Sequence, residues 1–233
     1  MSSGVRILIV DDDVPTRIGL RAILAPEPGF AIVGEAETGT EALAQIGSLN
    51  PDVVLMDVRL PDGDGIELTA AILAKSDPAP RVVVLTTFDF DEYAYRALQA
   101  GASAFLLKRT PAEEIVTAVS SVAAGDVLAA PARMTALVDQ FARPGSARQS
   151  DRFLPLTPRE YTVLRLIARG LSNAEIADEL MLSLDTVKTH VKHVYMKCGA
   201  RDRAQAVIAA YERGLVHQSG SSGGVDPPYG PGG

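Results

Sequence analysis

Apolar residues follow two different patterns along the chain. In the first half, short apolar runs typical of buried strands alternate with stretches that have the amphipathic spacing of helices. The runs predict strands at residues 5–10, 30–36, 52–56, 81–86 and 103–107. The helical stretches lie at about 15–25, 39–49, 65–76, 91–100 and 111–124. Five strands alternating with five helices predict an α/β fold with a doubly wound, five-stranded parallel sheet.

The pattern from residue 153 onward is helical only and predicts about four short helices. Thr157 and Ser172 each precede a glutamate by three residues, which is the signature of a capping box at a helix start. A third helix begins at Ser183 or Asp185, after a tight connection. A short helix, a tight turn and a second helix predict a helix-turn-helix within an all-α, four-helix domain.

These patterns predict four segments. Residues 1–125 form the α/β domain and residues 153–218 the helical domain. Residues 126–152 contain one short helical pattern followed by Pro, Gly and Ser, which is typical of a linker. Residues 219–233 are rich in Gly, Ser and Pro and predict a disordered tail.

Charge separates the two domains. The chain has a net charge of −7, but residues 1–125 hold 18 acidic and 9 basic side chains, while residues 153–218 hold 7 and 9. This asymmetry favours different partners for the two domains. No apolar run is long enough for a membrane helix, the N-terminus does not resemble a secretory signal, and the single cysteine cannot form an internal disulfide. We therefore expect a cytoplasmic protein with no membrane contact.

Acidic residues follow two of the predicted strands. Asp57 comes directly after the apolar run of the third strand, and Asp11 and Asp12 follow the first. In a sheet of order 2-1-3-4-5, strands one and three are neighbours, so the three carboxylates converge at the carboxyl edge. Like charges this close need a cation, and ligation by oxygen alone points to Mg²⁺.

Two further side chains meet the same edge. Thr86 ends the fourth strand, and Lys108 follows the fifth. Carboxylates, a metal ion, a hydroxyl and an ammonium group together suit a phosphoryl group carried on one carboxylate.

This set of residues resembles the receiver domain of two-component response regulators over residues 5–124. The resemblance implies that Asp57 accepts a phosphoryl group from a phosphohistidine on a sensor histidine kinase. It implies that Mg²⁺ binds Asp12, Asp57 and the backbone carbonyl of Arg59, with Asp11 in support through water. It also implies that Thr86 moves towards the phosphoryl group while the ring of Phe105 turns inward.

The predicted third helix of the second domain has two distinct faces. Val187, Val191 and Val194 recur at steps of four and three and should face the core. The other side is polar and basic, which suits the major groove of double-stranded DNA. Its residues are Lys188, Thr189, Lys192 and His193, with Thr186 and His190 on the flanks.

The helical segment resembles the LuxR/FixJ-type DNA-binding domain. The resemblance rests on the capping box after Leu156, on the segment around Ser172, on Thr186-Val187-Lys188 and on Lys197. It implies that Lys188, Thr189 and Lys192 contact bases while Thr186 and His190 contact the DNA backbone, and that the last helix forms a dimer contact. The small excess of positive charge argues that tight binding needs a homodimer, because dimerisation doubles the phosphate contacts.

Together the two domains predict a response regulator of the NarL/FixJ family that acts as a transcription factor and is not an enzyme. Phosphorylation of Asp57 would control dimerisation and DNA binding, with RNA polymerase as a further candidate partner. Two alternatives remain. A regulator of this kind can act independently of phosphorylation, with the receiver as an interaction platform. A Mg²⁺-dependent phosphatase of the haloacid-dehalogenase type needs a threonine two residues beyond Asp13, where this chain has Pro15.

Overall fold

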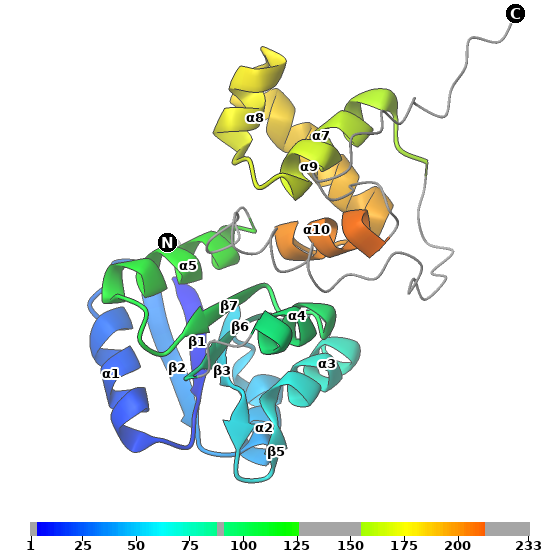
Figure 1. The fold of residues 1–233 in the computed structure, drawn as a ribbon. Helices are drawn as coiled ribbons and strands as arrows, with labels where there is room; N and C mark the ends of the chain where they lie inside the picture. Colours follow the sequence, from blue (N-terminus) through cyan, green and yellow to red (C-terminus); the bar gives the residue numbers. More distant parts are fainter. Residues whose placement is uncertain (1–3, 88–90, 126–154, 213–233) are drawn as a thin grey trace, which may run out of the picture.

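The computed structural model describes residues 4–87, 91–125 and 155–212 of the chain. The predicted linker at 126–152 and the predicted tail at 219–233 therefore lie outside the described residues. The described residues form an α/β part and a helical part, with helix α10 (Arg203–Glu212) on the side of the helical part that faces the α/β part (Figure 1).

The α/β part is built on five parallel strands. They are β1 (Val5–Val10), β2 (Phe30–Ala36), β3 (Val53–Asp57), β6 (Arg81–Thr86) and β7 (Ala104–Leu107). Their order across the sheet is β2-β1-β3-β6-β7, and every neighbouring pair is parallel. Numbered along the main sheet, this is the order 2-1-3-4-5, so the fold prediction is confirmed.

Five helices cover the two faces of this sheet. They are α1 (Val14–Leu24), α2 (Gly39–Leu49), α3 (Gly65–Lys75), α4 (Asp91–Gln99) and α5 (Ala112–Ala124). The side chains of α1 and α5 form one core cluster with alternate strand residues, and those of α2, α3 and α4 form the other. The central strands β1, β3 and β6 are therefore buried on both sides, which explains the continuous apolar runs in their sequences.

A small antiparallel hairpin, absent from the expected elements, follows β3. It pairs β4 (Arg59–Leu60) with β5 (Gly63–Asp64). Asp64 then caps α3 by accepting a hydrogen bond from the backbone N–H of Ile66. The next residue must be glycine, because a Cβ on Gly65 would lie only 1.9 Å from the carbonyl oxygen of Asp57.

The helical part contains the four predicted helices. They are α7 (Pro158–Ala168), α8 (Asn173–Leu180), α9 (Leu184–Cys198) and α10. Thr157 and Ser172 both form the predicted capping boxes, and Ser183 caps α9. Helices α8 and α9 are the helix-turn-helix pair, and Met181 in the connection adopts a left-handed conformation with φ 52°.

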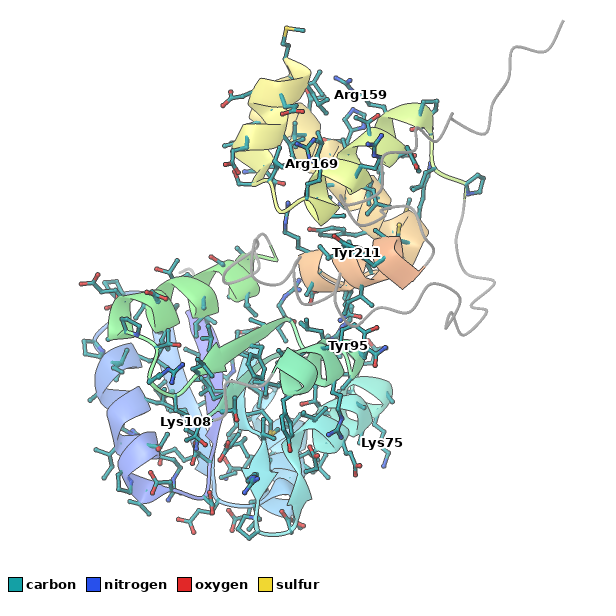
Figure 2. The ribbon with its side chains drawn as sticks, viewed as in Figure 1. Lys75, Tyr95, Lys108, Arg159, Arg169 and Tyr211 are labelled. Carbon is teal, nitrogen blue, oxygen red and sulfur yellow. The ribbon has the colours of Figure 1, made fainter. Side chains whose placement is uncertain are left out.

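The two parts share one apolar cluster. Tyr95 and Leu98 of α4 are buried among side chains of α7, α9 and α10. Figure 2 shows Tyr95 and Tyr211, on α4 and α10 respectively, on the facing sides of the two parts. Helix α10 is buried almost all round, because its own domain covers one side and α4 packs on another.

Candidate functional site

Three acidic side chains converge at the carboxyl edge of the sheet. Asp57 is the last residue of β3, and Asp11 and Asp12 follow β1, which is paired with β3. One carboxylate oxygen from each residue lies within 4.8 Å of the others. Asp11 and Asp57 are buried, while Asp12 is exposed. Three clustered carboxylates with one side open to solvent are a donor set that suits a hard cation such as Mg²⁺.

Lys108 offsets part of the negative charge of this site. Its Nζ lies 2.7 Å from Asp11 Oδ2 and 2.8 Å from Asp57 Oδ2. Burial alone would lower the pKa of Lys108, but hydrogen bonds to Asp11 and Asp57 outweigh it and raise that pKa. Burial raises the pKa of Asp57, and the hydrogen bond from Lys108 opposes that rise. In Figure 2 Lys108 lies at the end of the sheet that points away from the helical part.

The remaining predicted receiver residues surround this cluster. Thr86 is the buried last residue of β6, and its backbone carbonyl accepts a hydrogen bond from the N–H of Lys108 at 2.7 Å. Arg59 lies two residues after Asp57, at the start of β4. Phe105 is half-buried on β7 and packs against the cluster formed with α2, α3 and α4. Thr86 and Lys108 therefore lie at the acidic edge, whereas Phe105 lies two residues further back along its strand.

The candidate DNA-binding residues lie on α9. Val187, Val191 and Val194 are buried in the core of the helical part, as predicted. The opposite face carries exposed Lys188, Thr189, Lys192, Thr186 and His193, while His190 is half-buried. Two of these side chains already have local partners. Thr189 Oγ1 donates to the carbonyl of Asp185, and Thr186 Oγ1 lies 2.8 Å from Oγ of the capping residue Ser183.

A buried ion pair links the C-terminal end of α9 to α7. Glu160 of α7 is 4% exposed, and its Oε2 accepts a hydrogen bond from Lys197 Nζ at 2.7 Å. Burial tends to raise the pKa of Glu160, but Lys197 and the capping hydrogen bonds of Thr157 outweigh it and lower the pKa to about 2. His193 Nδ1 lies 3.9 Å from the other Glu160 oxygen, so this side chain is within ion-pairing distance of α7.

Comparison with known proteins agrees with both halves of the structure. Residues 7–120 match the family model of the response regulator receiver domain, and residues 154–210 match the model of bacterial regulatory proteins of the luxR family. The chain belongs to the LuxR-type response regulators. It therefore combines a receiver domain with a LuxR-type DNA-binding domain, as two-component systems use them.

Named relatives span nearly the whole chain. The response regulator protein VraR of Staphylococcus aureus is 37% identical over 212 residues, covering 91% of this chain and 99% of the relative. The RcsB response regulator of Salmonella typhimurium has 25% identity and a TM-score of 0.53 over 88% of this chain and 97% of that one. A LuxR-family response regulator from Aurantimonas has 35% identity and a TM-score of 0.51 over 54% of this chain and 89% of that one. No described helix is long and apolar enough to cross a membrane.

Two acidic residues near the receiver site have structural roles that the sequence did not predict. Asp13 caps α1 by accepting hydrogen bonds from Thr16, which lower the pKa of Asp13. Asp62, in the turn of the β4–β5 hairpin, accepts hydrogen bonds from the backbone N–H groups of Gly39 and Thr40 at the start of α2. These contacts fix the loop between β1 and α1 and the β4–β5 hairpin that follows Asp57.

Arg17 was missed although the sequence carried a signal for it. It stands on the inner face of α1, in register with buried Leu20 and Leu24, where the periodicity calls for an apolar residue. A charged residue at such a position indicates a buried ion pair.

Proposed function

We propose that Asp57 is the phosphoacceptor of this response regulator and that a sensor histidine kinase is its phosphodonor. A carboxylate oxygen of Asp57 attacks the phosphorus of the phosphohistidine, a P–O bond forms, and the P–N bond to the imidazole breaks. The observation that supports this role is the position of Asp57 between two carboxylates and an ammonium group, at an edge of the sheet that is open to solvent on the side of Asp12.

The same cluster provides a site for Mg²⁺. We assign Asp12, Asp57 and the backbone carbonyl of Arg59 as direct ligands, with Asp11 acting through water. The ion offsets the charge that the phosphoryl group brings to three carboxylates. Lys108, which bridges Asp11 and Asp57, supplies a positive charge for the phosphoryl oxygens, and the hydroxyl of Thr86 supplies a hydrogen bond to them.

Helix α9 is the proposed reader of double-stranded DNA. Lys188, Thr189 and Lys192 contact base edges in the major groove, while Thr186 and His190 contact the backbone. His193 is the weaker candidate, because Glu160 lies close enough to hold its ring towards α7. The exposed side chains of this face are Thr186, Lys188, Thr189 and Lys192, while His190 is half-buried. The described part of the receiver domain therefore leaves most of this surface accessible.

We infer that the receiver domain restrains dimerisation instead. Helix α10, which this family resemblance makes a dimer contact, is packed on α4. Gln205 Nε2 donates to the carbonyl of Leu98 at 2.9 Å, and Ser103 Oγ donates to Asp202 at 2.6 Å. Phosphorylation would move Thr86 and the ring of Phe105, weaken this interface, and free α10 for a second copy of the chain. The dimer then places two α9 helices on adjacent half-sites, where RNA polymerase is a candidate partner.

The test is intact mass after incubation with acetyl phosphate and Mg²⁺, followed by sedimentation and DNA-shift measurements. We expect a gain of one phosphoryl group that requires Mg²⁺ and is absent in Asp57→Asn, accompanied by dimer formation. If wild-type protein gains no mass but binds DNA as a dimer, the chain acts independently of phosphorylation and this proposal is wrong.

A further inference from the structure

Arg17 is a buried cation with three acceptors in the receiver domain. Its side chain is 8% exposed, although it projects from a helix on the surface of the sheet. Nη1 donates to the backbone carbonyl of Asp11 at 2.7 Å, Nε lies 3.3 Å from Glu35 Oε2, and Nη2 pairs with Glu37. A buried guanidinium is tolerated only when its donors are paired, and here all three nitrogens are.

The carbonyl of Asp11 is the informative partner. It belongs to the peptide bond that leads into Asp12, the exposed acid of the proposed metal site. The rest of Asp11 is held as well, because its N–H donates to the carbonyl of Ala36 and its Oδ1 accepts from the N–H of Asp13. The charge-assisted bond from Arg17 therefore fixes the remaining polar group of this residue's backbone, and with it the plane of the Asp11–Asp12 peptide.

Arg21 provides a natural comparison on the same helix. It lies one turn after Arg17 and also pairs with Glu35, with Nε 2.6 Å from Oε1. Its side chain is 54% exposed, and within the described residues it pairs with the carboxylate of Glu35. The two arginines thus share an ion-pair partner, but Arg17 is the one that reaches the acidic loop.

We propose that Arg17 is a positioning residue for the Mg²⁺ site, holding the Asp11–Asp12 peptide in the orientation that presents the Asp12 carboxylate to the ion. This inference rests on the proposed function of the acidic cluster. Arginine suits the task because its planar fork makes all three contacts at once, which a lysine ammonium on a flexible stem does not reproduce.

The experiment measures Mg²⁺ affinity of the full chain by titration calorimetry at 25 °C, together with its thermal midpoint without Mg²⁺. The variants are Arg17→Met and Arg17→Lys, with Arg21→Met as the matched control. Losing a group that orients a metal ligand weakens metal binding by about 10–100-fold. We expect a weakening in this range for Arg17→Met, a smaller one for Arg17→Lys, and less than about a twofold change for Arg21→Met, which loses only an exposed ion pair.

A purely structural role gives a different result. In that case Arg17→Met lowers the thermal midpoint but binds Mg²⁺ as tightly as wild type, and the inference is overturned. The rate of phosphorylation by acetyl phosphate adds a second criterion, because a positioning defect is rescued by saturating Mg²⁺. If Arg17→Met does not fold, wild-type affinity in Arg17→Lys overturns the inference equally.

Failure of the underlying function is distinguishable from failure of this inference. If wild-type protein binds no Mg²⁺, or if Asp57→Asn and wild type bind it equally, the assignment of the acidic cluster is wrong. If wild type binds Mg²⁺ and the Arg17 variants match it, the cluster stands and only the role of Arg17 is lost.

Discussion

Ser103 of the receiver domain and Asp202 of the DNA-binding domain form a buried hydrogen bond of 2.6 Å across the domain interface. Ser103 immediately precedes β7, and Lys108 immediately follows it, 2.8 Å from Asp57. One short strand therefore has the domain interface at one end and the proposed phosphoacceptor at the other. In the proposed switch, a displacement of β7 would reach Asp202 directly, through the hydrogen bond from Ser103.

Removing this hydrogen bond should favour release of α10 from α4, and therefore dimerisation, in unphosphorylated protein. A hydrogen bond to a charged group contributes about 1.5–3 kcal/mol, so we expect Ser103→Ala to shift the equilibrium towards dimers about tenfold or more. Sedimentation of unphosphorylated protein measures the shift. The change leaves α10 capped, because Asp202 Oδ1 still accepts a hydrogen bond from the N–H of Gln205.

The matched control for this variant is Ser48→Ala. The hydroxyl of Ser48 donates only to carbonyls of its own helix α2, and the side chain is exposed, remote from α10. It should leave the monomer–dimer equilibrium unchanged. An unaltered equilibrium in Ser103→Ala would mean that the interface does not restrain α10.

Thr86→Val should permit phosphorylation of Asp57 but weaken the dimerisation that phosphorylation causes. Valine has nearly the shape of threonine but lacks the hydroxyl proposed to bind the phosphoryl group. We expect the variant to gain the mass of one phosphoryl group, since Asp57, Lys108 and the acidic pair are intact. The phosphorylated variant should dimerise less than phosphorylated wild type, as measured by sedimentation at equal degrees of modification. A full response would exclude Thr86 from the switch.

Local features of the receiver domain were predictable because they depend on residues close together in sequence. The apolar runs gave the strands to within about one residue at each end, and α2 lies at the predicted residues 39–49. The acidic edge was also predictable, because the order of parallel strands brings Asp11 and Asp57 together. The capping boxes of α7 and α8 depend on a spacing of three residues, so they too were visible in the sequence.

Contacts between distant residues could not be predicted in the same way. Ser103 and Asp202 are 99 residues apart, and Asp62 and Gly39 are 23 apart. Nothing in the spacing of the chain pairs them, because the tertiary arrangement alone brings them together. Asp62 is an example, because it ties the hairpin that follows Asp57 to the start of α2.

Substitutions on the exposed face of α9 should weaken DNA binding without affecting the receiver. We expect Lys188→Ala and Lys192→Ala each to reduce the affinity for an operator. The dependence of that affinity on salt concentration distinguishes a lysine that contacts a base from one that contacts a phosphate. A lysine that neutralises one phosphate contributes about one unit to the slope of log affinity against log salt. Lys75→Ala, an exposed lysine of α3, is the control and should leave both affinity and slope unchanged.

The ion pair between Glu160 and Lys197 should make the stability of the DNA-binding domain depend on pH in the acidic range. The pKa of Glu160 in the folded chain is about 2, below its ordinary value of 4.5. Between these values the unfolded chain binds a proton that the folded chain does not, so the stabilising contribution is complete above about pH 4.5 and is lost as the pH falls towards 2. The pKa of Glu160 thus defines the pH window of the test.

Glu160→Gln isolates this contribution, because glutamine still serves at the third position of a capping box while losing the charge that pairs with Lys197. At pH 7 the thermal midpoint of the variant should lie below that of wild type. The gap should narrow below about pH 4.5 and become small near pH 2, where about half of the wild-type Glu160 side chains are protonated. If the difference in thermal midpoint stays constant from pH 7 to pH 2, Glu160 contributes through packing and capping. In that case its charge does not contribute to the way α7 supports α9.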